Sequence, residues 1–199
     1  AVLGGGVVGS NAARMAAGLG AEVVVLERSI PRMRELDDLY QGRILTRYST
    51  FAAVEEEILK ADVIIGAVLT AGAAAPKLVR REHLKQMKPG SVLVDVSIDQ
   101  GGCFETSKPT THAEPTYTVD GVVHYCVANM PGAAPRTSSE ALGNATLPFG
   151  LALADHGLDA LKTNVHLARG LNVLKGQLTH PAVAQALGKP SVDPYGAWT

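Results

Sequence analysis

Three glycines near the start of the chain constrain its fold more than any other feature. A short apolar run enters Gly4-x-Gly6-x-x-Gly9, and small residues continue from it as a helical stretch. A second apolar run over residues 22–26 ends on Glu27, 18 residues after Gly9. Gly4 allows a tight turn, Gly6 allows close approach to a pyrophosphate, and Gly9 lets the helix pack on the sheet. This order of strand, glycine turn, helix, strand and acid predicts a dinucleotide-binding unit.

Composition narrows the class of protein. A length of 199 residues suggests one large domain or a domain with an appendage. A net charge of −1 provides no basic surface for nucleic acid. The apolar stretches are shorter than the roughly 20 residues that a membrane span needs, so no membrane association is expected. We expect a cytoplasmic protein in which Cys103 and Cys126 are free thiols rather than a disulfide.

The sequence starts within its first strand, without an initiator Met. We therefore expect a fragment or an excised domain, which would lack any catalytic group supplied from upstream.

Strand-length apolar runs alternate with helical segments over the first two thirds of the chain. The expected strands cover residues 2–3, 23–26, 43–46, 63–68, 92–96 and 122–127, and the expected helices cover 8–19, 30–40, 51–60 and 80–87. Asp120-Gly121 is suited to a tight turn between two short strands. Such alternation predicts an α/β fold, a Rossmann-type doubly wound parallel sheet, over residues 1–135.

The pattern changes beyond residue 135. Residues 137–140 offer helix caps, and helices are expected over 141–155, 158–170 and 182–187, with no strands. We interpret residues 136–199 as a helical arm outside the sheet. Several of its apolar side chains would need another surface to cover them: Leu142, Leu147, Leu151, Leu153, Leu158, Leu161 and Leu167.

Glu27 is the strongest candidate for recognising the cofactor. A carboxylate at the end of the second strand can accept hydrogen bonds from both hydroxyls of the adenosine ribose. A 2′-phosphate would meet like charge there, so the sequence favours NAD over NADP. Arg28 and Arg32 lie nearby and would weaken this exclusion. The alternative for both arginines is a solvated helix start.

Polar residues also follow two later strands, where the carboxyl ends of parallel strands form a ligand-binding edge. Asp99 is a candidate for proton transfer or for orienting ammonium or water, and its alternative role is to cap a turn. Asn129 could bind a ring substituent or be an ordinary loop residue. The six histidines lack metal-ligand spacing, so no metal site is expected.

Longer motifs resemble the alanine dehydrogenase family. They cover residues 88–105, 108–112, 125–131, 144–148 and 154–157, and the likeness runs nearly end to end. The resemblance implies a two-domain, NAD-dependent, usually hexameric enzyme that interconverts L-alanine with pyruvate and ammonia. It implies that the arm would complete a substrate domain whose main part precedes this chain.

The resemblance also assigns roles to residues. Asp99 matches the catalytic aspartate, Glu27 the ribose-binding acid and Arg32 a basic residue near the adenosine. The full set of implied cofactor-binding residues is Gly4, Gly6, Val7, Val8, Gly9, Glu27, Arg32, Ser49, Val68, Leu69, Val96, Ser97, Ile98, Asp99, Lys108, Val127, Ala128, Asn129 and Met130.

Two departures from the family pattern matter. The family's substrate-binding Arg and Lys and its catalytic His belong to the domain that precedes this chain. Some relatives bind a metal through a Glu and a His on the first arm helix; His156 matches the His, but Ala152 replaces the Glu.

Two alternatives remain: the NAD-binding subunit of a proton-translocating transhydrogenase, and a chain that only binds nucleotide. The segment 98–104 favours the dehydrogenase, because it lacks the insertion that transhydrogenases carry at that strand end.

Overall fold

The computed structural model describes residues 1–68 and 75–193 of the chain. Within it the chain forms two compact units, Ala1–Met130 and Pro131–Thr199. The division lies between Met130 and Pro131, whereas the sequence pattern placed the change after residue 135. Each unit is described by itself below.

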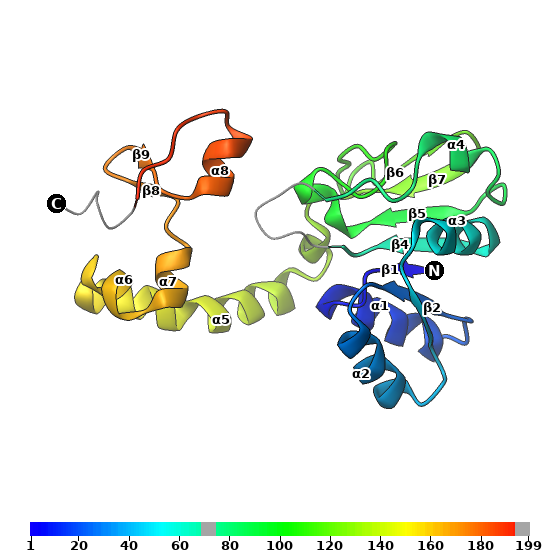
Figure 1. The fold of residues 1–199 in the computed structure, drawn as a ribbon, viewed down its shortest axis with the longest axis horizontal. Helices are drawn as coiled ribbons and strands as arrows, with labels where there is room; N and C mark the ends of the chain where they lie inside the picture. The colour runs from blue at the N-terminus through cyan, green and yellow to red at the C-terminus, as the bar shows by residue number, and fades with distance from the viewer. Residues whose placement is uncertain (69–74, 194–199) are drawn as a thin grey trace. The chain divides into compact units, whose positions relative to one another are not determined.

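The first unit is built on a seven-stranded sheet with the order β3-β2-β1-β4-β5-β7-β6 (Figure 1). All neighbouring strands are parallel except β6 and β7, which form an antiparallel pair. The strands are β1 (Val2–Leu3), β2 (Val24–Glu27), β3 (Leu45–Tyr48), β4 (Val63–Gly66), β5 (Val92–Asp95), β6 (Thr116–Val119) and β7 (Val122–Tyr125). The predicted α/β doubly wound sheet is confirmed, although β3 begins two residues later than expected.

Helices connect these strands close to the positions that the sequence predicts, although the helix expected over 80–87 covers only four residues. They are α1 (Val7–Gly18), α2 (Ile30–Tyr40), α3 (Phe51–Lys60) and the short α4 (Arg81–Leu84), with 3₁₀ turns at η1 (Val96–Gln100) and η2 (Met130–Ala133). Side-chain caps determine two of the helix starts. The Ser29 hydroxyl accepts from the amide of Arg32 at 3.3 Å, and the Thr50 hydroxyl accepts from the amide of Ala53 at 3.1 Å.

Side chains alternate along β1 and β2, so both faces of the sheet are covered. Val2 belongs to one buried cluster and the neighbouring Leu3 to the other. The first cluster contains Val2, Ala13, Val23, Val25, Leu36 and Ile44, and the second includes Leu3, Leu26, Val54, Ile58, Ile64 and Leu93. Each large side chain buried in this way contributes roughly 1.5–3 kcal/mol of transfer free energy. The two layers hold the carboxyl ends of the strands in fixed register.

The second unit contains α5 (Pro135–His156), α6 (Asp159–Thr163), α7 (Val165–Arg169), β8 (Val173–Leu174), β9 (Gln177–Leu178) and α8 (Pro181–Ala186). Two predictions were wrong here. The helix expected over 158–170 is interrupted at Asn164, whose side-chain oxygen accepts from the amides of His166 and Leu167 and caps α7. The strands thought absent exist as a hairpin, closed by Lys175 and Gly176, both at positive φ.

Helix α5 has no buried residue in the described structure. It starts earlier than expected, at Pro135, and its apolar side chains are largely exposed: Leu142, Leu147, Phe149, Leu151 and Leu153. Leu161 was expected to need another surface to cover it, but it is buried within the second unit and only 4% exposed. None of the helices in the described part of the chain combines the length and hydrophobicity that membrane crossing requires.

Candidate functional site

A cavity of about 740 Å³ lies at the carboxyl ends of the central strands of the first unit. It is lined by residues of the glycine turn and by the ends of β2, β3 and β4, among them Gly4, Gly6, Glu27, Ser49 and Val68. Strand order reverses here, since β1 lies between β2 and β4. Open α/β sheets bind ligands at such a switch point. The structure therefore brings several of the predicted site residues to one cavity.

The glycine turn has the geometry that its spacing predicts. Gly4 has a φ of +100°, and a Cβ added there would lie 2.6 Å from the carbonyl oxygen of Ala67. A Cβ on Gly9 would lie 1.8 Å from the carbonyl oxygen of Gly4. A Cβ on Gly6 would meet no atom of the chain within 4 Å. Gly4 and Gly9 are therefore required by internal packing, whereas at Gly6 the missing side chain serves close approach from outside.

Helix α1 begins immediately after Gly6, which caps it without a side-chain hydrogen bond. Val7 and Val8 form its first turn and are 79% and 47% exposed. The first amides of a helix have no partner within the helix, and its dipole favours negative charge. The start of α1 therefore fits a pyrophosphate next to the glycine turn.

Glu27 is held in place by backbone amides. Its Oε2 accepts from Gly5 at 2.7 Å, and its Oε1 accepts from Arg28 at 2.7 Å and Ser29 at 2.9 Å. Burial raises the pKa of Glu27, but these three hydrogen bonds and the charge of Arg32 outweigh it, so the pKa lies below its usual value. The side chain is therefore a carboxylate at neutral pH, and Oε2 retains capacity for another donor.

Arg32 contacts the same glycine through its carbonyl group. Its Nε donates to the carbonyl oxygen of Gly5 at 2.8 Å, and one terminal nitrogen donates to Glu35 at 2.7 Å. Gly5 itself is buried, and a Cβ there would lie 2.9 Å from Leu36 Cδ1. Gly5 was not among the predicted site residues, although the run of three glycines, Gly4 to Gly6, was the available signal. Glu27 and Arg32 thus fix the peptide groups on either side of its Cα.

The ends of β4 and β5 are joined at the predicted cofactor rim. The hydroxyl of Ser97 donates to the carbonyl oxygen of Val68 at 2.7 Å. Ser97 and Ile98 are buried in η1, whereas Asp99 is exposed on the same turn and Val96 is half-buried. The expected contact residue Leu69 lies outside the described residues. The turn thus presents Asp99 at the carboxyl edge of the sheet.

Asp95 also belongs to this rim, although it was not among the predicted site residues. Its fully buried carboxylate accepts from the amides of Ser97 at 3.1 Å and Cys103 at 2.9 Å, and from the hydroxyl of Ser107. The available signal was a charged residue inside the apolar strand 91–96, where a carboxylate needs such partners. Burial and the Asp95 carboxylate raise the pKa of the Cys103 thiol.

Two of the motifs that resemble the family, segments 108–112 and 125–131, lie side by side. Thr110 bridges to Val127 and its carbonyl accepts from the amide of Ala128 at 3.2 Å. His112 Nε2 donates to the carbonyl oxygen of Asn129 at 2.6 Å, and Asn129 is an exposed residue.

Met130 opens η2 next to these residues. Lys108 lies over the ring of Tyr117, with Nζ 4.4 Å from the ring centre. Its contacts in the structure are thus with β6.

Cys103 and Cys126 are free thiols, as predicted, and both are buried.

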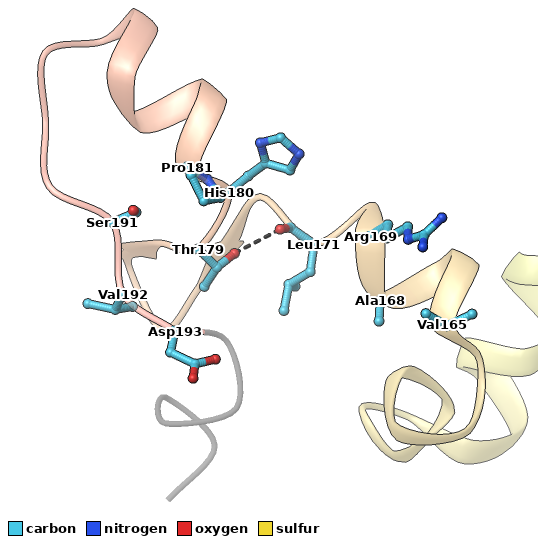
Figure 2. Close-up of a pocket in the computed structure, with 10 residues that line it drawn as sticks. All are labelled: Val165, Ala168, Arg169, Leu171, Thr179, His180, Pro181, Ser191, Val192 and Asp193. Carbon is cyan, nitrogen blue, oxygen red and sulfur yellow. Dashed lines mark hydrogen bonds between the residues drawn. The ribbon is translucent and has the colours of Figure 1, made fainter. Parts of the chain in front are cut away.

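A second cavity, of about 580 Å³, lies in the second unit between α7, α8 and the segment after α8 (Figure 2). Thr179 donates to the carbonyl oxygen of Leu171 at 2.8 Å on its wall, and Arg169, His180 and Asp193 are its ionisable residues. No residue that the sequence singled out lines this cavity. Among the described residues, no group of three His, Cys, Asp or Glu side chains could hold a metal ion.

The doubly wound sheet, the glycine turn at its switch point and the acid that ends β2 define a dinucleotide-binding domain. A family model described as "Alanine dehydrogenase/PNT, C-terminal domain" matches residues 1–181, and the chain belongs to this family. Family and fold together imply a nicotinamide cofactor.

Known relatives agree with this assignment. The chain is 68% identical to an alanine dehydrogenase from Halomonas elongata and 53% identical to one from Mycolicibacterium smegmatis, each over 96% of the chain. It spans about half the length of these curated relatives, 52% in both cases. A solved L-alanine dehydrogenase is 51% identical over 94% of this chain and 52% of its own, with a TM-score of 0.85. A transhydrogenase from Sinorhizobium meliloti is 30% identical over 91% of this chain and 49% of its own, with a TM-score of 0.69.

Proposed function

We propose that this chain is the NAD-binding domain and carboxyl-terminal arm of an NAD-dependent L-alanine dehydrogenase. The observation that carries the proposal is identity of 68%, over nearly the whole chain, to a protein of that name. The cavity at the switch point supports it independently, because its glycine turn and carboxylate suit a dinucleotide.

The residues present fit NAD. The open approach at Gly6 and the first turn of α1 would hold the pyrophosphate. Glu27 would accept from the adenosine ribose, and its negative charge disfavours a 2′-phosphate. Arg32 already binds Gly5 and Glu35, which makes it a poor phosphate partner. NAD is therefore the proposed cofactor rather than NADP.

The reaction would be the reversible oxidative deamination of L-alanine to pyruvate and ammonia. Bound NAD supplies the hydride acceptor for the alanine Cα. The exposed carboxylate of Asp99 would orient the ammonium group or the attacking water and accept a proton from it. The substrate-binding Arg and Lys and a His acid/base would come from the preceding domain that the family resemblance implies. The chain alone should therefore bind the cofactor without turning over alanine.

The second unit would complete the substrate domain and contribute to subunit contacts. The exposed apolar side chains of α5 support this role, since such a surface normally meets another one. A homohexameric assembly stays a prediction from the resemblance, and a cytoplasmic location stays a prediction from the sequence.

The alternative function is hydride exchange between nucleotides by a transhydrogenase. Identity of 30% to such a protein, against 51% to L-alanine dehydrogenase, makes it the weaker candidate. The test uses this chain joined to the substrate domain of a relative. Alanine-dependent reduction of NAD supports the proposal. Hydride transfer from NADH to an NADP analogue, with no response to alanine, would support the alternative.

A further inference from the structure

The Asp95 carboxylate closes the loop that carries Asp99. Asp95 lies four residues before Asp99, at the end of β5, and its side chain is 0% exposed. One oxygen accepts from the amide of Ser97, and the other accepts from the amide of Cys103 and from the hydroxyl of Ser107. The same carboxylate therefore holds residues on both sides of Asp99.

The loop wraps tightly around this carboxylate. Gly102 has a φ of +74°, and a Cβ there would lie 2.7 Å from Asp95 Oδ2. Its amide also donates to the carbonyl oxygen of Ser97 at 3.0 Å, which closes the loop across its base. Only a residue without a side chain fits between the carboxylate and the backbone.

Outer contacts tie the same loop to its surroundings. Ser97 bonds to the end of β4 through Val68, and Lys77 donates to the carbonyl oxygens of Gly101 and Gly102. Asp95, in contrast, is buried and accepts hydrogen bonds from the backbone amides of the loop. An exposed lysine contact is weaker in water than a buried carboxylate that accepts several hydrogen bonds.

We propose that Asp95 is a positioning residue for Asp99: it sets the conformation of residues 96–104 and so the place of the Asp99 carboxylate at the rim. The proposal rests on the proposed function, because it assigns Asp99 its role in alanine turnover. Asp95 itself does not line the cavity formed by the described residues, so it should act through the loop and leave cofactor affinity nearly unchanged.

The structural part is tested by hydrogen exchange on the chain with Asp95→Asn. The asparagine amide would point an NH₂ donor at groups that are themselves donors. The amides of Ser97, Cys103 and Phe104 all donate to Asp95, the last at 3.4 Å. Their exchange should rise about tenfold or more, while exchange in β2 and α3 stays unchanged. The control Asp62→Asn alters an exposed aspartate before β4 and should change none of these amides. Unchanged exchange in the Asp95 variant would overturn the proposal.

A second variant covers failure of Asp95→Asn to fold. Ser107→Ala removes one donor to the same carboxylate and leaves its backbone partners in place. Exchange at Cys103 should then rise severalfold, with no change in β2. Protection at Cys103 equal to that of the unaltered chain would contradict the positioning role.

The functional part is tested by a double-mutant cycle in the chain joined to a substrate domain. Asp95→Asn should lower kcat for alanine about tenfold or more and change the KM for NAD by less than about twofold. Because Asp95 acts through Asp99, the double variant should be no slower than Asp99→Asn alone. If the kcat losses of the two single variants multiply in the double variant, the proposal is overturned. Absence of alanine turnover in the unaltered protein would refute the proposed function, while the exchange result still decides the positioning of the loop.

Discussion

The backbone amide of Gly5 donates to Glu27 Oε2 at 2.7 Å, which links the glycine turn to the end of β2. The acid that is proposed to recognise the cofactor therefore also orders the loop that would bind its phosphates. Arg32 contacts the carbonyl oxygen of the same glycine, so both peptide groups of Gly5 are fixed before any ligand binds. Preorganisation of this kind lowers the entropic cost of binding.

Replacement of Glu27 should alter nucleotide discrimination. NADH should bind at least about tenfold tighter than NADPH, because a hydrogen bond to a carboxylate contributes roughly 1.5–3 kcal/mol. Glu27→Ala should shrink that ratio, whereas Glu22→Ala, at an exposed position before the start of β2, should leave it unchanged. Fluorescence titration of both nucleotides measures the ratio. Equal dissociation constants in the unaltered chain would contradict the role of Glu27 and implicate Arg28.

Gly6 and Gly9 should respond differently to the same substitution. Gly9→Ala places a Cβ 1.8 Å from a backbone oxygen, so it should destabilise the chain by about 3 kcal/mol or more. Gly6→Ala meets no atom of the chain and should change the free energy of unfolding by less than about 1 kcal/mol. It should nevertheless weaken NADH binding about tenfold. Urea unfolding and NADH titration separate the two effects; tight NADH binding by the Gly6 variant would argue against this pyrophosphate site.

Stability should fall on mild acidification because of His124. Burial lowers the pKa of this histidine, although its contact with the Val122 carbonyl and the charge of Asp95 oppose that shift. The unfolded chain takes up the proton near pH 6.5, while the folded chain stays neutral to lower pH. The free energy of unfolding should therefore decrease as the pH falls below about 6.5. Urea unfolding between pH 7.5 and 5.5 should show a shallower slope for His124→Asn; identical slopes would contradict the assignment.

Asp99→Asn should separate binding from turnover. The substitution is nearly isosteric, and Asp99 lies on the rim turn without lining the cavity that the described residues form at the glycine turn. NADH affinity should stay nearly unchanged, while pyruvate amination by the chain joined to a substrate domain should fall roughly 10²–10⁴-fold. Steady-state kinetics and NADH titration test both statements. A loss below about threefold in rate would remove Asp99 from the catalytic group.

Local requirements explain why the first βαβ unit was predictable from sequence. Gly9 packs against Gly4, and Glu27 accepts from Gly5, so both meet constraints set within the first 27 residues, and their spacing records them. Gly4 has a positive φ in the turn, and it is also required by the chain after β4, since a Cβ there would lie 2.6 Å from the carbonyl oxygen of Ala67. The alternation of apolar strands and capped helices likewise predicted α2 and α3 at their observed bounds.

Other features depend on contacts that no local pattern records. Asp95 is explained only by partners that follow it by up to a dozen positions. The hairpin β8–β9 turns at Lys175-Gly176, and a lysine at positive φ lacks the usual sequence signal of such a turn. Asn164 could equally have continued a helix, and its capping role appears only once the amides of α7 face it.

The most direct test follows the hydrogen on the alanine Cα. The chain is joined to the part of the Halomonas elongata relative that it does not match, and the product is incubated with NAD and L-alanine deuterated at Cα. We predict that the reduced cofactor carries the deuterium and that one pyruvate forms for each molecule of cofactor reduced. The chain alone should bind NADH without turning over alanine. Reduced cofactor without deuterium, or no reduction although NADH binds tightly, would contradict the assignment of this chain as the cofactor domain of an L-alanine dehydrogenase.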